Sequence, residues 1–287
     1  MSAGRAGSSF VCDALNLHPL VCCQLESHHL PLLIETFGLT AVHPRALLAV
    51  TKQAVFHTGE PVVYSALANL NISEHSFVRW QTQLIAKFDV MTISEFQEAL
   101  SAFFLFETDK LIFVDKTPCY SWYISSFRKH LLESRFVNLA RDCGPSVNSM
   151  LEHPGFLAKI RTNESTWTSI LLNHSLSEID FEVRKPTKAE ILDMARLWAI
   201  RTNAAYKFSE PDHVLDLTYE ELIENPRRFF EKLCISLDIP MNNEWLEQVV
   251  KNVKPSRRNQ TRKSENFESD FLILPEVTEV RSRLGYE

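Results

Sequence analysis

The sequence predicts an α/β fold in which helices pack on a parallel sheet. Three short apolar runs rich in β-branched and aromatic residues indicate strands at residues 111–114, 136–140 and 214–218. A helical pattern follows each run, and strands that alternate with helices are typical of βαβ units. Ligands of such sheets bind at the carboxyl ends of the strands, so that edge is where functional residues are expected.

A glycine-bearing turn near the start of the chain is the first candidate anion site. Residues 4–9 read GRAGSS and lead directly into an amphipathic stretch, so the turn is expected to open a helix. Backbone N–H groups and small hydroxyls at a helix N-terminus favour an anion. The turn lacks the GK[ST] of a Walker A loop. Because few residues precede Gly4, the strand that would lead into such a turn is expected to be truncated.

A second candidate anion site follows the strand at 136–140, where Arg141 precedes Ser149 by eight residues. This spacing is about two helical turns, so a loop arginine and a helix serine can hold one phosphate from two sides. Lys116 ends the strand at 111–114 and is expected at the carboxyl edge of the sheet. Each feature alone has an ordinary structural explanation. Together they indicate a ligand with two separate phosphate groups.

Helical segments are expected as insertions in a single domain over 1–287, at about 40–107 and 155–206. The region 187–206 reads as one long helix, and another helix is expected to begin at Pro226. Residues 74–106 are rich in aromatic side chains. These either form a hydrophobic lid over an acceptor or belong to the core, and the core is the favoured interpretation.

Composition excludes several classes of function. A net charge of −6 argues against a general nucleic-acid binder, although a basic run begins at Lys254. No stretch approaches the roughly 20 apolar residues of a membrane span. The six cysteines show no metal-ligand spacing and are expected to be reduced and mostly buried. A cytoplasmic location is favoured, and the alternative is a secretory-pathway enzyme that lacks its N-terminal anchor.

Four segments resemble, in order, the characteristic segments of sulfotransferases that use 3′-phosphoadenylyl sulfate (PAPS). They are GRAGSSFVCDALNLHP, FVDKTP, NLARDCGPSVNSM and LTYEELIENPRRFFEKL. The resemblance is nearest to tyrosylprotein sulfotransferases and to the sulfotransferase domains of bacterial polyketide pathways. It implies a P-loop-like three-layer fold with a central parallel sheet and helical insertions.

The resemblance also implies which residues bind the donor. The loop for the 5′-phosphosulfate would consist of Arg5, Ala6, Gly7, Ser8 and Ser9. The 3′-phosphate would be held by Arg141 and Ser149. Further donor contacts would come from Tyr219, Lys254, Ser256, Arg257 and Arg258.

Glu26 matches the general base of the protein-tyrosine branch, because it lies eight positions past the histidine of a His18-Pro19 pair. The soluble small-molecule branch instead uses a histidine two residues past the strand-end lysine. This chain has Pro118 at that position, so the role cannot be filled there. His28 and His29 lie close to Glu26 in the sequence and are rival bases.

The expected function is transfer of a sulfuryl group from PAPS to a hydroxyl of an organic acceptor, without a metal. Glu26, Lys116 and Arg5 are the expected catalytic residues, with Glu26 as base and the two cations neutralising the departing oxygen. The acceptor, a small molecule, lipid, glycan or peptide, is left open. The first alternative is a pseudoenzyme that binds PAP or PAPS without turnover, and the weaker one is a P-loop nucleotide kinase.

Overall fold

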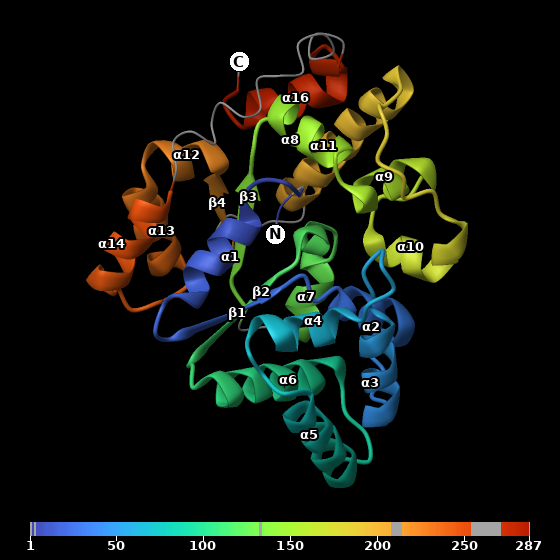
Figure 1. The fold of residues 1–287 in the computed structure, drawn as a ribbon, viewed down its shortest axis with the longest axis vertical. Helices are drawn as coiled ribbons and strands as arrows, with labels where there is room; N and C mark the ends of the chain where they lie inside the picture. Colours follow the sequence, from blue (N-terminus) through green and yellow to red (C-terminus); the bar gives the residue numbers. More distant parts are fainter. Residues whose placement is uncertain (1, 3, 132–133, 208–213, 254–270, 287) are drawn as a thin grey trace. The chain divides into compact units, whose positions relative to one another are not determined.

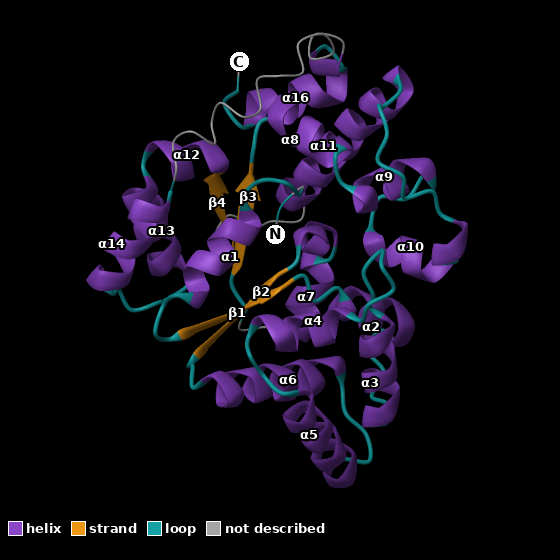
Figure 2. Cartoon of the chain, viewed as in Figure 1, coloured by secondary structure: helices purple, strands orange, loops and turns teal. Residues whose placement is uncertain are grey.

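Parallel strands lie in each of the two compact units into which the chain divides (Figures 1 and 2). Unit 1 comprises Met1–Phe10, Pro118–Ile124 and Arg135–Glu287, and unit 2 comprises Val11–Thr117 and Ser125–Ser134. The computed structural model describes residues 2, 4–131, 134–207, 214–253 and 271–286. Over these residues it confirms a mixed α/β fold with parallel strand pairing.

In unit 1, β3 (Phe136–Ala140) pairs in parallel with β4 (Val214–Thr218), and both strands have the predicted bounds. Ala140 lies opposite Thr218, so Arg141 and Tyr219 are the next residues at one edge of the pair. Ser2 adds a single parallel bridge to Leu139. This bridge lies where the sequence predicted a truncated strand before the glycine turn.

Helices follow both strands of unit 1, as predicted. α8 (Cys143–Leu151) follows β3, α12 (Tyr219–Glu224) follows β4, and the predicted long helix is α11 (Lys188–Lys207). The other helical segments of unit 1 are η1 (Pro118–Trp122), α9 (Pro154–Arg161), α10 (Trp167–Asn173), η2 (Leu176–Glu178), α13 (Pro226–Ser236), α14 (Asn243–Asn252) and α16 (Pro275–Arg283). Buried apolar side chains of α8, α11 and α16 form one core that includes Trp198.

In unit 2, β1 (Val21–Leu25) pairs in parallel with β2 (Ile112–Lys116), and Leu25 lies opposite Lys116 at their carboxyl ends. The sequence predicted β2 but missed β1, because nearly all of β1 is buried and shows no alternation of apolar and polar residues. Among the described residues, hydrogen bonds therefore join the strands in two parallel pairs, where the sequence predicted one central sheet. The extent of the domain, 1–287, stays a prediction.

The helices of unit 2 surround an aromatic core. α1 (Ser8–Asn16) follows the glycine turn as predicted and is divided between the two units. The others are α2 (His29–Phe37), α3 (Pro44–Gln53), α4 (Val62–Asn69), α5 (Glu74–Lys87), α6 (Ile93–Thr108) and α7 (Ile124–His130). Phe77, Phe96 and Phe104 are fully buried, whereas Phe106 is 83% exposed. The aromatic residues of 74–106 thus belong mainly to the core, which is the favoured interpretation.

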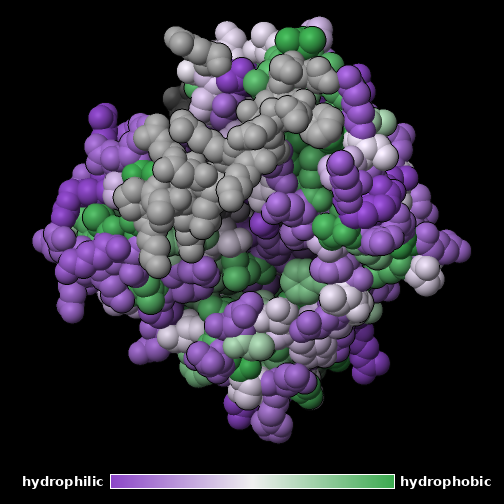
Figure 3. All heavy atoms as spheres, turned by 45° about the horizontal axis from the view of Figure 1, so that its top comes forward, coloured by the Kyte–Doolittle hydropathy of each residue, from purple (hydrophilic) through white to green (hydrophobic). Residues whose placement is uncertain are grey.

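The surface of the described residues is mixed in character. Hydrophilic residues cover most of the face drawn in Figure 3, with smaller apolar patches between them. In the part of the chain that the structure describes, none of the helices has the length and apolar content to span a membrane.

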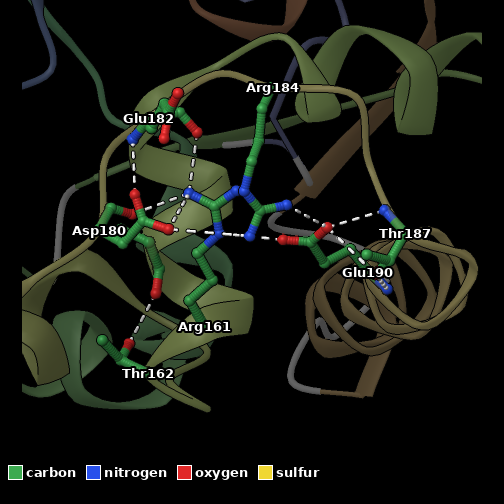
Figure 4. Close-up of polar contacts among 8 residues, drawn as sticks. Arg161, Thr162, Asp180, Glu182, Arg184, Thr187 and Glu190 are labelled. Carbon is green, nitrogen blue, oxygen red and sulfur yellow. Dashed lines mark hydrogen bonds and ion pairs between the residues drawn. The ribbon is translucent and has the colours of Figure 1, made fainter.

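A network of charged side chains holds the segment before α11 to α9 in unit 1 (Figure 4). Arg161 donates from Nε to Glu190 Oε1 at 3.0 Å and pairs with Asp180 Oδ2 at 3.1 Å. Arg184 Nη1 and the backbone N–H of Thr187 both donate to Glu190 Oε2, at 3.2 and 2.8 Å. Burial alone would raise the pKa of Glu190, but these hydrogen bonds outweigh it and lower the pKa to about 2.

Glu190→Gln is expected to lower the free energy of unfolding at pH 7 by about 2 kcal/mol. Because the folded-state pKa of Glu190 lies below its ordinary value of 4.5, the stabilisation is present above that value and is lost as the pH falls towards 2. Urea unfolding at pH 7 and pH 3 measures both effects. Glu182→Gln, which changes an exposed carboxylate on the same segment, is the control. An equal difference between wild type and Glu190→Gln at both pH values would contradict the prediction.

Candidate functional site

The glycine turn of unit 1 depends on backbone conformations and close approaches that a side chain would disturb. Gly4 and Gly7 have φ of 100° and 83°, and Arg5 between them has φ of 58°. A Cβ on Gly4 would lie 2.3 Å from the Phe156 ring, and one on Gly7 would lie 2.7 Å from the Tyr219 ring. The turn therefore requires glycine at both positions. At Gly7 the backbone of the turn packs against Tyr219, the residue that follows β4.

α1 begins directly after this turn, as a phosphate-binding loop requires. Ser8 and Ser9 are its first residues, and Ala6 before them is buried. Ser8 is mostly buried and Ser9 is exposed. The first N–H groups of a helix have no partner within it, so this end offers donors to an anion.

Arg5, Arg141, Ser149 and Tyr219 come together in unit 1 although they are far apart in the sequence. Arg5 Nε donates to Ser149 Oγ at 2.9 Å. Arg141 Nη1 donates to the carbonyl oxygen of Arg5 at 3.1 Å, and its guanidinium lies over the Tyr219 ring, 4.3 Å from the centroid. Two guanidinium groups and a hydroxyl thus gather along α8, with Arg141 just before its first residue and Ser149 in its last turn.

The charge and chemistry of this cluster fit a phosphate group. Guanidinium groups are donors only, and they match the geometry of phosphate oxygens. Burial and the nearby charge of Arg5 lower the pKa of Arg141, while Tyr219 and Glu220 oppose that shift. An arginine remains protonated in such surroundings. The sequence placed Arg5 at the sulfated end of the donor, and the structure places its side chain on Ser149, at the predicted 3′-phosphate end.

The basic run that was predicted to cover the donor is not placed. Lys254, Ser256, Arg257 and Arg258 all lie outside the described residues.

In unit 2, Glu26 and Lys116 form an ion pair at the carboxyl ends of β1 and β2. Lys116 Nζ donates to Glu26 Oε1 at 2.8 Å. The Lys116 side chain is buried, whereas 35% of the Glu26 side chain is exposed. His28 Nε2 lies 3.5 Å from the other carboxylate oxygen, Oε2. Glu26 is therefore a partly accessible carboxylate with a buried cation on one oxygen.

The turn that carries Glu26 is held in an unusual conformation by residues that the sequence analysis missed. Glu26 and His28 have positive φ values, 44° and 48°. Between them, the Ser27 N–H donates to Thr117 Oγ1 at 2.9 Å, and Ser27 Oγ donates to Asp115 Oδ2 at 2.5 Å. Thr117 Oγ1 also donates to Asp115 Oδ1 at 2.8 Å. Asp115 and Thr117 flank Lys116 in the sequence, and both bind Ser27 in this turn. Two polar residues on either side of the strand-end lysine were therefore the sequence signal for this arrangement.

Electrostatics set different charge states for Glu26 and the nearby His29. Burial alone would raise the pKa of Glu26, but the charge of Lys116 and a hydrogen bond from His28 hold it well below its usual range. Glu26 is consequently ionised at neutral pH. His29 is fully buried, its Nε2 lies 3.0 Å from Gln97 Oε1, and burial lowers its pKa. His29 is therefore neutral and turned into the core.

Five of the described cysteines, Cys12, Cys22, Cys23, Cys143 and Cys234, are buried and form no disulfide bond. Among the residues that the structure describes, no group of three or more His, Cys, Asp or Glu side chains is arranged to hold an ion.

Comparison with known proteins identifies a matching family model and solved structures with a similar fold. The model of a family described as "Sulfotransferase family" matches residues 1–243. A search of curated proteins finds no match.

The solved structures with a similar fold include two sulfotransferase domains. One is a sulfotransferase domain from the curacin biosynthetic pathway, with a TM-score of 0.61 and 15% identity, covering 100% of this chain and 96% of that chain. The other is a sulfotransferase domain from the olefin synthase of Synechococcus PCC 7002, with a TM-score of 0.59, 15% identity and coverage of 100% and 93%. At these identities the likeness concerns the fold alone.

Proposed function

Because the chain belongs to the sulfotransferase family, we propose that it transfers a sulfuryl group from PAPS to a hydroxyl group of an organic acceptor. The observation that carries the choice of donor is the contact of Arg5, Arg141 and Ser149 beside Tyr219. Two arginines and a serine beside an aromatic ring match the charge and the donors that the 3′-phosphate of such a nucleotide needs.

Each cluster has its own part in this proposal. Arg141, Ser149 and Arg5 hold the 3′-phosphate of the donor by charge-assisted hydrogen bonds. Ser8, Ser9 and the first N–H groups of α1 hold the 5′ end. The donor, when bound, supplies a sulfuryl group whose bond to a phosphate oxygen breaks as the acceptor oxygen bonds to sulfur.

Lys116 and Glu26 serve the chemical step. The ionised Glu26 carboxylate accepts the proton of the acceptor hydroxyl, which is the form its low pKa maintains at neutral pH. Lys116 provides a buried positive charge that can neutralise developing negative charge. The two roles are coupled, because Lys116 bonds directly to the base and any weakening of that bond makes Glu26 more basic.

The proposal is tested by incubating the protein with labelled PAPS and a panel of hydroxyl acceptors: phenols, aliphatic alcohols, sugars, lipids and tyrosine peptides. Release of PAP together with a labelled acceptor is the expected result. Thermal stabilisation by PAP without any labelled product would instead favour a protein that binds the donor without turnover. Tighter binding of ATP than of PAP would favour the kinase alternative.

A further inference from the structure

The last helix of unit 1 contacts the segment that carries Arg141, although it lies beyond the 1–243 range of the family model. Arg281 of α16 donates from Nε to Asp142 Oδ1 at 2.9 Å and from Nη2 to Asp142 Oδ2 at 3.4 Å. Both side chains are mostly buried. Asp142 also caps α8 by accepting from the Cys143 N–H. The residue directly after Arg141 is thus held from two directions.

A second contact from the C-terminal segment reaches the residue after Tyr219. Tyr286 donates its hydroxyl to Glu220 Oε2 at 2.5 Å. The other oxygen of Glu220, Oε1, accepts from the Asp142 backbone N–H at 3.3 Å. Glu220 therefore links the C-terminal segment, the turn after β3 and the turn after β4.

The helix that provides these contacts is firmly anchored. Val277 and Val280 of α16 are buried in the core that also contains Trp198 of α11. Trp198 Nε1 in turn donates to the carbonyl oxygen of Arg141 at 3.2 Å. Figure 1 shows α16 beside α8 and α11, in agreement with these contacts.

Charge gives these contacts a consequence for ligand binding. Glu220 attracts the guanidinium of Arg141, so its carboxylate competes with any phosphate for that guanidinium. The hydroxyl of Tyr286 occupies one oxygen of Glu220 and fixes the direction of the other. Arg281 in the same way occupies both oxygens of Asp142. The C-terminal segment thereby fixes the two carboxylates that follow Arg141 and Tyr219 in the chain.

We propose that Arg281 and Tyr286 are positioning residues that keep Arg141 and Tyr219 arranged to bind the 3′-phosphate of the donor. This inference rests on the proposed function. It extends the donor site to a segment outside the family model.

The test compares binding of PAP with binding of adenosine 5′-phosphate, which lacks the 3′-phosphate. Calorimetry is done on the full chain as wild type, Arg281→Met and Tyr286→Phe. Each variant is expected to bind PAP roughly fivefold to tenfold more weakly, in line with the loss of a charge-assisted hydrogen bond. Binding of adenosine 5′-phosphate is expected to stay unchanged, so the preference for PAP falls.

Arg196→Met is the matched control. Arg196 of α11 also ties that helix to α16, through an ion pair with Glu276 at 3.2 Å, but its ion-pair partners are Glu276 and Asp193 and not Asp142 or Glu220. Its PAP preference is expected to match the wild type. Melting temperatures of all variants accompany the binding data. If Arg281→Met does not fold, the inference is tested by Tyr286→Phe alone. This variant removes a single hydroxyl.

Four results would overturn the inference. Wild-type preference for PAP in both variants would do so while leaving the proposed function intact. An equal loss for both ligands, or the same loss in Arg196→Met, would show a general effect on the fold. Absence of PAP binding by the wild type would instead remove the proposed function together with the inference.

Discussion

Glu26→Gln is expected to lower kcat for sulfuryl transfer by about 10²–10⁴-fold, the usual contribution of a general base. Glutamine keeps the size of the side chain and can still accept a hydrogen bond from Lys116, but it cannot take up a proton at neutral pH. The affinity for PAP is expected to stay close to that of the wild type, because the partners of Glu26 are Lys116 and His28 and the proposed phosphate ligands are unchanged. Steady-state turnover of labelled PAPS and calorimetry with PAP measure the two quantities.

The pH profile distinguishes a base from a structural carboxylate. Glu26 acts in its ionised form, so activity is lost as the pH falls through its pKa, which Lys116 and His28 hold well below the ordinary range. Lys116→Met removes the largest lowering influence and leaves burial, which raises the pKa. The acid limb of kcat is therefore expected to move to higher pH in Lys116→Met and to stay near its original place in Lys116→Arg. Wild-type kcat in Glu26→Gln would show that another group takes the proton.

Much of the fold follows from local sequence patterns. The strands β3 and β4 have their predicted bounds, and α11 and α13 lie where apolar periodicity and Asn225-Pro226 place them. β1 was not predicted, because a strand that is buried on both faces shows no alternation of apolar and polar residues. The pairing of strands is set by contacts distant in the sequence, so the division into two pairs could not be read from any one segment.

In the candidate site, too, spacing within one segment could be predicted from the sequence, whereas contacts between segments could not. The Arg141 to Ser149 spacing placed a loop arginine and a helix serine about two turns apart, and the structure adds the contact of Ser149 with Arg5. That contact depends on the positive φ of Arg5, which composition does not reveal. The direct bond between Glu26 and Lys116 depends on the pairing of the unpredicted β1 with β2. Asp115 and Thr117 stand beside Lys116 in the sequence. Their role, which is to bind Ser27 in the turn at residues 26–28, becomes apparent only in the structure.

Arg141→Ala is expected to weaken PAP binding by about 100-fold, which corresponds to about 3 kcal/mol and to the loss of a bidentate charge-assisted contact. Arg141→Lys is expected to give an intermediate loss, because lysine keeps the charge but lacks the planar fork and cannot stack on Tyr219 in the same way. Ser149→Ala is expected to have the smallest effect, since it removes one neutral hydroxyl. Calorimetry with PAP ranks the three variants.

The specific role of Arg141 is tested by the ligand as well as by the variant. Adenosine 5′-phosphate lacks the 3′-phosphate, so Arg141→Ala is expected to weaken its binding far less than that of PAP. Arg141 also donates to the carbonyl oxygen of Arg5, and a purely structural role would act through the glycine turn. In that case both ligands would lose affinity equally and the melting temperature would fall. A selective loss for PAP at an unchanged melting temperature requires instead that the guanidinium itself meets the 3′-phosphate.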